Sequence, residues 1–277
     1  MVKYRAVKPL FVLFIFLIAI VLLTIPGCSV DLLGLFKSED LDIRLKDRNT
    51  FHFLTAQDRN IVLPEEYSFI VLTDTHIMEG KSFGFENLPS VIEDAAFVVV
   101  LGDITQNGAE EDVQKFITIA KTLNVPCYPV LGNHDIYFNH WPVWRDSIGS
   151  SSYRIDGSNT TLFVLDTANA FFGNTQLEWL NRELKTVKSH VFIFTHTNLF
   201  VETINDIQQL TDLQERARIM AMLEGRCEAF FMGHIHKRII KTYGSVQYIT
   251  IEDFRSTKIY CRVRVSPKGI SYTFEKL

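Results

Sequence analysis

Short apolar runs that end in Asp, Asn or His recur along most of this 277-residue chain. The run 127–131 leads directly into Gly132-Asn133-His134-Asp135, and four other runs end in a similar way. Runs of this length that alternate with helical patterns predict an α/β fold with an internal sheet. Because the carboxyl ends of parallel strands meet at one edge of a sheet, these endings predict a shared functional site.

The intervals between these endings predict the order of the elements from residue 67 onward. We expect helices near 88–95, over 109–123, from residue 175 onward and over about 204–223. We expect strands over 67–73, 97–101, 127–131, 153–155, 161–166, 191–194 and 229–232, followed by a hairpin of 259–265 and 270–274.

The first 27 residues have the pattern of a signal peptide. Three basic residues among the first eight precede an apolar stretch over 10–25. This stretch is short for a membrane-spanning helix, which needs about 20 apolar residues, and suits a signal sequence. It ends before Cys28 in a pattern that resembles a bacterial lipoprotein signal, in which the Cys becomes the lipidated first residue. Pro26 departs from that pattern, so an uncleaved N-terminal anchor and ordinary cleavage stay open as alternatives.

All three alternatives predict an extracytoplasmic domain. Lipidation would anchor it to the membrane through Cys28, and an uncleaved signal would anchor it through the N-terminal segment. We divide the chain into a signal peptide at 1–27, a lipidated Cys with tether and edge element at 28–65, and one α/β domain at 66–277. Leu41, Ile43 and Leu45 alternate with charged residues, which predicts a half-buried edge strand.

Charge and cysteine content limit the possible partners. Without residues 1–27 the chain has 25 basic and 32 acidic residues, a net charge of −7, so general nucleic-acid binding is not expected. Apart from Cys28, three cysteines at 127, 227 and 261 allow at most one disulfide, and we expect buried thiols.

Histidines are concentrated in the strand-end loops. Any one of them alone could be an ordinary structural histidine, but repetition of the same placement argues for a common site. Five of the eight histidines lie there: His76, His134, His196, His234 and His236.

The ligand types in these loops favour two metal ions. Four imidazoles, two carboxylates and one amide oxygen exceed what a four-coordinate zinc site needs, and two cations sharing a carboxylate would use them all. Mixed nitrogen and oxygen donors without thiolate favour manganese, iron or zinc. The predicted ligands are Asp74, His76, Asp103, Asn133, His196, His234 and His236.

The order of these motifs resembles the calcineurin-like metallophosphoesterase family. The resemblance covers about residue 67 to at least residue 236, and it identifies 66–277 as a metallophosphoesterase domain. It implies a β-sandwich flanked by helices, a four-layer α/β/β/α architecture, with a binuclear centre at its rim. The motifs are Asp74-x-His76, Gly102-Asp103, Gly132-Asn133-His134-Asp135, His196 and Gly233-His234-x-His236.

The resemblance also assigns roles. His134 matches the family histidine that is not a ligand and that contacts the scissile phosphate or protonates the leaving group. One metal would be held by Asp74, His76, Asp103 and His236. The other would be held by Asp103 as the bridge, Asn133, His196 and His234.

The expected function is hydrolysis of phosphate esters, more specifically phosphodiesters, by a metal-activated hydroxide with His134 assisting the leaving group. Gln106 and Asn107 stand where the phosphoprotein phosphatases of the family carry an Asp-Arg pair, which argues against a phosphoserine or phosphothreonine phosphatase. The pattern is nearest to the cyclic-nucleotide-phosphodiesterase-like members. The alternatives are a pyrophosphatase acting on a nucleotide or lipid diphosphate, and a membrane-tethered binding module without turnover.

Aromatic residues near two of the motifs allow a second interpretation. Phe83 and Phe85 follow the first motif and could flank the substrate or anchor their loop. Trp141 and Trp144 follow the Asn-His-Asp motif, and we favour packing of a short helix for them. Asp135 is expected to be a hydrogen-bond partner of the site and not a ligand.

Overall fold

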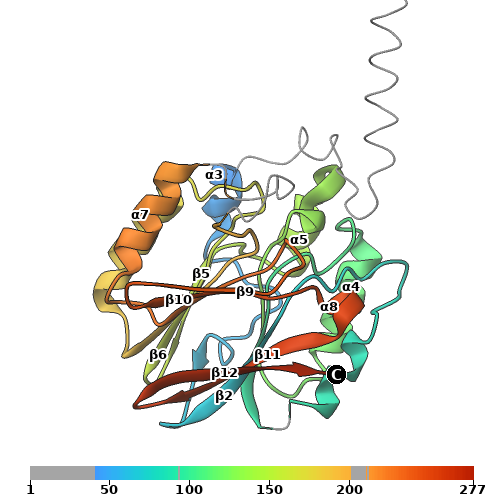
Figure 1. The fold of residues 1–277 in the computed structure, drawn as a ribbon. Coiled ribbons are helices and arrows are strands. Elements are labelled where there is room, and N and C mark those ends of the chain that lie inside the picture. The colour runs from blue at the N-terminus through green and yellow to red at the C-terminus, as the bar shows by residue number, and fades with distance from the viewer. Residues whose placement is uncertain (1–40, 93, 201–209, 211) are drawn as a thin grey trace, which may run out of the picture. The chain divides into compact units, whose positions relative to one another are not determined.

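The structure is a computed structural model that describes residues 41–92, 94–200, 210 and 212–277 (Figure 1). In this part of the chain, twelve strands form two sheets, and helices cover the outer face of each sheet. The strands are β1 Asn60–Ile61, β2 Tyr67–Leu72, β3 Ala95–Val100, β4 Cys127–Pro129, β5 Tyr153–Gly157, β6 Thr160–Val164, β7 His190–Phe194, β8 Ala229–Met232, β9 Ile239–Tyr243, β10 Val246–Thr250, β11 Ile259–Ser266 and β12 Gly269–Lys276. The α-helices are α3 Leu41–Arg44, α4 Glu110–Ala120, α5 Trp141–Ser147, α6 Asn174–Glu183, α7 Leu213–Leu223 and α8 Phe254–Thr257.

The strand order places many carboxyl ends at one edge of each sheet. The five-stranded sheet has the order β12-β11-β2-β3-β4, in which β2, β3 and β4 are parallel. The seven-stranded sheet has the order β1-β5-β6-β7-β8-β10-β9, in which β6, β7, β8 and β10 are parallel. Seven strands therefore deliver their following loops to sheet edges in the way that the sequence predicts.

The central strands are buried on both faces, which explains their continuous apolar sequences. Phe69 and Val71 of β2 pack in the core between the sheets, whereas Ile70 and Leu72 pack under the helices. The same alternation holds in β7, where residues 192 and 194 face the other sheet and residues 191 and 193 face α6 and α7. The core between the sheets and the two cores under the helices therefore separate four layers: helices, sheet, sheet and helices.

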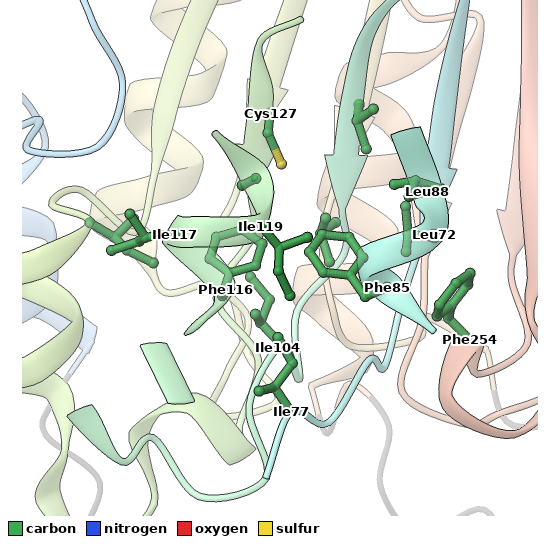
Figure 2. Close-up of a cluster of buried hydrophobic side chains, with 14 of the residues drawn as sticks. Leu72, Ile77, Phe85, Leu88, Ile104, Phe116, Ile117, Ile119, Cys127 and Phe254 are labelled. Atoms are coloured by element: carbon green, nitrogen blue, oxygen red, sulfur yellow. The ribbon is translucent and has the colours of Figure 1, made fainter. Parts of the chain in front are cut away.

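The outer layer of the five-stranded sheet is held by an amphipathic α4. Val113, Phe116 and Ile117 recur at helical spacing and join the apolar cluster drawn in Figure 2, together with Phe85 and Phe254. Three acidic residues in the first turn of α4 stabilise the helix, because they interact favourably with the positive end of its dipole. The predicted α/β/β/α architecture is confirmed.

Three predicted elements are wrong in detail. Residues 41–45 form α3 and the start of a 3₁₀ helix, η1 (Leu45–Asp47), because the buried positions 41, 44 and 45 follow helical spacing. The edge strand of this segment is β1. The helix expected near 88–95 is a 3₁₀ helix, η2 (Phe85–Ser90), and Ala95 already belongs to β3.

The helix expected over 204–223 begins only at Leu213. The side chain of Asp212 accepts hydrogen bonds from the N–H groups of Gln214 and Glu215, which caps α7 at that point. Positions 204–209 and 211 of the prediction lie outside the described residues, as do the predicted signal peptide and Cys28. Within the described ranges, no helix has the length and apolarity required to cross a bilayer.

Candidate metal centre

The eight predicted site residues all follow strands, seven of them in loops and His134 as the first residue of a 3₁₀ helix, η3 (His134–Asn139), and the structure brings them together. Asp74 and His76 follow β2, Asp103 follows β3, and His196 follows β7. The potential ligand atoms of the site histidines and carboxylates form three groups. Within each group, all these atoms lie within 4.8 Å of one another. These groups are Asp74, His76 and His236; His76, Asp103 and His134; and Asp103, His196 and His234.

Asp74 anchors the first group through a division of labour between its two oxygens. Oδ2 accepts hydrogen bonds from Thr73 Oγ1 at 2.6 Å and from the His234 N–H at 3.1 Å. Oδ1 lies 3.2 Å from His236 Nε2 and 3.7 Å from His76 Nε2. The protein therefore fixes one oxygen and leaves the other among two imidazoles, which suits a carboxylate ligand.

The group of Asp103, His196 and His234 converges on His196. Its Nδ1–H donates to the Leu101 carbonyl at 2.8 Å, which leaves the Nε2 lone pair for the site. Nε2 lies 2.9 Å from His234 Nδ1, 3.1 Å from Asn133 Oδ1 and 3.2 Å from Asp103 Oδ2. Three other atoms of ligand type thus lie within 3.2 Å of His196 Nε2.

Asp103 belongs to both halves of the site. Its Oδ1 accepts a hydrogen bond from the His134 N–H at 2.9 Å, and its Oδ2 faces His196. It also shares a group with His76, which in turn belongs to the group of Asp74. This central position is the one that a bridging carboxylate requires.

His76 gives a direct test of whether metal ions fit these residues. Both of its ring nitrogens are buried and have no hydrogen-bond partner among the described residues. A buried polar group without a partner is unfavourable by about 1–3 kcal/mol, so such groups are rare unless an ion or water satisfies them. A cation bound to His76 would remove that penalty, and the imidazole, carboxylate and amide donors around it suit manganese, iron or zinc.

The electrostatics of the side chains favour charged carboxylates. Burial alone would raise the pKa of Asp74, but the hydrogen bond with His236 and the nearby imidazole of His76 hold that pKa well below its usual value. Burial likewise opposes ionisation of Asp103, and nearby His196 and His134 lower its pKa below the usual range. Both acids are therefore available as anionic ligands.

The histidines diverge in basicity. Burial and the neighbouring His196 lower the pKa of His234 to about 3. Burial also disfavours the charged form of His196, but Asp103 outweighs it and raises the pKa to about 9. For His236, the hydrogen bond to Asp74 overcomes burial and raises the pKa to about 8. These protons would be displaced on metal binding, which is expected of a ligand cluster.

His134 differs from the other histidines in its contacts. Its Nδ1 lies 2.7 Å from the Gln106 carbonyl, and its Nε2 lies 3.9 Å from Asp103 Oδ2. Burial lowers its pKa, against the attraction of Asp103. Its ring meets that of His76 edge-on, with centroids 4.8 Å apart. His134 therefore lies beside the ligand groups with a fixed Nδ1 and an available Nε2.

The loops that carry these side chains are strained. The backbone at Asp74, His76, Asp103, His234 and His236 has positive φ, between 46° and 73°. Positive φ is uncommon for residues other than glycine and concentrates at functional sites. The strain therefore coincides with the predicted ligands.

Two glycines allow the strand ends to approach one another. A Cβ at Gly132 would lie 2.1 Å from the backbone nitrogen of Asp103. A Cβ at Gly233 would lie 2.0 Å from Thr73 Oγ1 and 2.9 Å from Asp74 Oδ2. Glycine is therefore required for steric reasons directly before Asn133 and directly before His234.

A sequence comparison agrees with this geometry, because the model of the calcineurin-like phosphoesterase family matches residues 67–238. This chain belongs to the calcineurin-like phosphoesterase family. Its members are phosphoester hydrolases, as the resemblance of the motifs predicted, and that prediction is confirmed at the level of the family.

Curated relatives of this phosphoesterase carry phosphodiesterase names. A probable cyclic nucleotide phosphodiesterase from Fibrobacter succinogenes is 26% identical over 171 residues, which cover 57% of this chain and 65% of that protein. A probable glycerophosphodiester phosphodiesterase from Arcobacter nitrofigilis is 30% identical, with 50% and 56% covered. A probable cyclic nucleotide phosphodiesterase from Rhodopseudomonas palustris is 25% identical, with 65% and 75% covered. The match therefore spans less than two thirds of the first two relatives.

Solved structures share the fold of the phosphoesterase. A dimetal phosphatase from Danio rerio matches with a TM-score of 0.60 at 16% identity, over 75% of this chain and 98% of that chain. A purple acid phosphatase from yellow lupin matches with a TM-score of 0.62 at 11% identity, over 77% and 52%. At these identities the likeness concerns the fold alone.

Asp135 lies behind the metal centre and ties two loops together. Its carboxylate accepts hydrogen bonds from the N–H groups of Ile104, Thr105 and Gly132, at 3.3, 2.8 and 3.0 Å. Burial and the charge of Asp103 raise its pKa to about 7. It holds the loops after β3 and β4 at a fixed spacing, as expected of a supporting residue.

The aromatic residues near the site fall into two classes. Phe85, Trp141 and Trp144 are buried in the core under the helices, which favours packing over substrate contact. Phe83 is half-buried and lies against the guanidinium of Arg255, at 4.4 Å from ring centroid to Cζ.

The sequence analysis did not single out Arg255. Arg255 lies in α8, which follows β10. Because β10 runs parallel to β7 and β8, its carboxyl end lies at the same edge of the sheet as theirs. The strand-end pattern was therefore present, but residues 246–250 were not among the predicted strands.

Proposed function

We propose that this phosphoesterase is a binuclear metal-dependent hydrolase that prefers phosphodiesters. The observation that carries the proposal is the central place of Asp103, between a group with His76 and a group with His196 and His234. One carboxylate shared by two ligand groups suits two cations held close together.

The proposed ligand assignment follows the observed groups. The first metal would be held by Asp74, His76, Asp103 and His236, and the second by Asp103, Asn133, His196 and His234. When bound, two cations lower the pKa of a water molecule to near neutrality and neutralise charge on phosphoryl oxygens. The residues of the chain fix the spacing of the ligands and keep both carboxylates ionised.

His134 is the proposed proton donor to the leaving group. The Gln106 carbonyl at 2.7 Å accepts the Nδ1 proton, so the ring cannot turn away and Nε2 faces the ligand groups. A protonated Nε2 would donate to the leaving oxygen as the ester bond breaks.

Hydrolysis of two chromogenic esters tests the proposal. The metal-stripped protein should be inactive, and manganese, zinc or iron should restore cleavage of bis-p-nitrophenyl phosphate more strongly than that of p-nitrophenyl phosphate. The names of the curated relatives support the diester preference, since both substrate types named there are phosphodiesters. Two bound metals without cleavage of either ester would instead support a narrow substrate or a binding module.

The proposed location is extracytoplasmic and membrane-anchored through lipidated Cys28. The basic start, the apolar stretch over 10–25 and the Cys that follows support it. Mass spectrometry of the protein from a bacterial membrane fraction should find a lipid-modified N-terminal Cys28. A protein that retains residues 1–27 would contradict lipidation and favour the uncleaved anchor.

A further inference from the structure

Arg255 lies beside the candidate metal centre, and among the described residues no carboxylate pairs with it. Its backbone N–H donates to the Asp74 carbonyl at 3.1 Å, so α8 is attached to the loop of a proposed ligand. Its Nη1 donates to Gln106 Oε1 at 2.9 Å, and within the described residues it forms no ion pair. A cationic side chain therefore reaches the site with most of its N–H groups unused.

Gln106 connects this guanidinium to His134. The Gln106 carbonyl lies 2.7 Å from His134 Nδ1, and its side-chain Nε2 lies 3.3 Å from the same atom. Arg255 is thus one side chain away from the proposed proton donor.

Phe83 lies against the guanidinium of Arg255. The Cζ of Arg255 lies 4.4 Å from the centroid of the Phe83 ring, which is the geometry of a cation–π contact. A guanidinium stacked by one face presents its N–H groups at its edge. The ring and Gln106 together leave an oriented donor edge.

The buried Arg44 pairs with Asp166 and the half-buried Arg154 pairs with Asp156, so each has its counter-charge within the protein. Arg255, like the half-buried Arg59, has no such partner among the described residues, but Arg255 lies at the candidate metal centre. Taking a guanidinium partly out of water is unfavourable unless an anion compensates it. At the edge of a phosphoesterase centre, the substrate can provide that anion.

We infer that Arg255 binds a non-bridging oxygen of the substrate phosphate, held in place by Gln106 and Phe83. The inference rests on the proposed function and extends it with a substrate-binding residue outside the metal ligands. Arg255 would compensate for the neutral Gln106 and Asn107, which stand where the phosphoprotein phosphatases of the family carry an Asp-Arg pair. A planar donor edge suits two oxygens of a phosphoryl group.

The test measures binding of inorganic phosphate to the metal-loaded protein by calorimetry. Arg255→Met keeps a long, unbranched side chain at this position but removes the charge, and should raise the Kd for phosphate about 10- to 100-fold. Arg255→Lys keeps the charge but not the planar pair of N–H donors, and should give an intermediate loss of phosphate affinity. Metal content and melting temperature should stay close to those of the parent protein.

Arg59→Met is the matched control. Arg59 is also half-buried and also lies over a phenylalanine, with Cζ 4.6 Å from the Phe51 ring, but it precedes β1 at the sheet edge. Phosphate affinity should be unchanged in this variant. An equal loss in both variants would indicate a general charge effect and overturn the inference.

A double variant separates substrate contact from an indirect effect. If Arg255 only orients Gln106, then Gln106→Ala should cause the same loss, and adding Arg255→Met should cause no more. If Arg255 contacts phosphate, the Arg255→Met loss persists in the Gln106→Ala background. The first result overturns the inference, and the second supports it.

Equilibrium binding also separates this inference from the proposed function. A protein that binds metal and phosphate but hydrolyses neither ester would contradict the proposed function, while an Arg255-dependent Kd would still support the contact. Equal phosphate affinity in the parent protein and Arg255→Met, including no binding by either, overturns the contact even if hydrolysis is found.

Discussion

The apolar core between the sheets and the candidate metal centre at the strand ends both contain fully buried side chains. In the core, Phe69 stacks on Phe97 with centroids 4.6 Å apart, and both are fully buried. In the metal centre, Asp74 and His196 are equally buried, but their neighbours are charged or polar. Burial stabilises the first region through the hydrophobic effect and opposes the second through desolvation.

The difference shows that the fold and the site make opposite demands on the same strands. The core strands have ordinary backbone conformations and apolar contacts. The loops beyond them contain five proposed ligands at positive φ and include His76, which has no hydrogen-bond partner among the described residues. Stability gained in the strands therefore supports strain in the loops. Substitutions in the two regions should separate stability from activity.

Asp103→Asn should have the largest effect, on activity and metal content but not on folding. Loss of the shared carboxylate should lower diester hydrolysis about 10⁴-fold, equivalent to ~5.5 kcal/mol, because both metal positions depend on it. Steady-state kinetics, metal analysis and thermal unfolding would show lost activity and at least one lost metal in a folded protein. Chelation of the parent protein should give the same loss.

Asp146→Asn is the control for that variant, because this aspartate is exposed and pairs with its neighbour Arg145. It should keep full activity. Retained hydrolysis in Asp103→Asn would contradict the bridging role.

Phe69→Ala should have the converse effect. Removing a fully buried ring that contacts Phe97 and Phe192 should lower the free energy of unfolding by about 3–5 kcal/mol. Urea unfolding measures the loss, and turnover per folded molecule should be nearly unchanged. Phe138→Ala, at a ring that is 54% exposed, should change stability by less than about 0.5 kcal/mol. Similar losses in the two variants would contradict the assignment of the core.

His134→Ala should lower turnover about 100- to 1,000-fold while metal content stays normal, since general acid catalysis typically contributes this much. His140→Ala is a closely matched control, because His140 Nδ1 also lies near a backbone carbonyl, that of Asn107, at 2.6 Å. The control should remain active. Loss of metal from His134→Ala would identify His134 as a ligand.

Gly233→Ala should disturb both regions, because its Cβ would collide with Thr73 at the end of a core strand and with Asp74 in the site. We expect a loss of about 1–3 kcal/mol in the free energy of unfolding together with weaker metal binding. Adding Thr73→Ala should restore part of the stability. Purely additive losses in the double variant would rule out the predicted collision.

The buried thiols should show the smallest effect. Burial raises the pKa of Cys127, Cys227 and Cys261, so iodoacetamide at pH 8 should leave all three unmodified in the native protein and modify them after unfolding. Peptide mass spectrometry gives the extent of labelling. Rapid labelling of Cys261 in the folded protein would show that the core next to β2 opens readily.

Local patterns predicted the central strands and the site loops well. Residues 69–72 and 191–194 are apolar at every position, which is expected of strands covered on both faces, and the loops after them carry the predicted ligands. The same local patterns failed at residues 41–45. An alternation of apolar and charged residues fits a strand, but Arg44 is fully buried and its Nε donates to Asp166 Oδ2 at 2.7 Å.

That ion pair joins residues 122 positions apart, so no local pattern could predict it. Arg255 was missed for a related reason. Its importance comes from its contacts with Phe83 and Gln106, which precede it by about 150 residues or more.

By itself, the sequence determined the family, the strand-end placement of the ligands and the α/β class, because these depend on residue type and short spacing. Only the tertiary structure decided which atoms face one another. The pairing of the two sheets brings His196 and His234 of one sheet against Asp103 of the other, and α8 brings Arg255 to Gln106. These contacts arise from packing of both strand faces in a common core, a property of the whole fold and not of any segment.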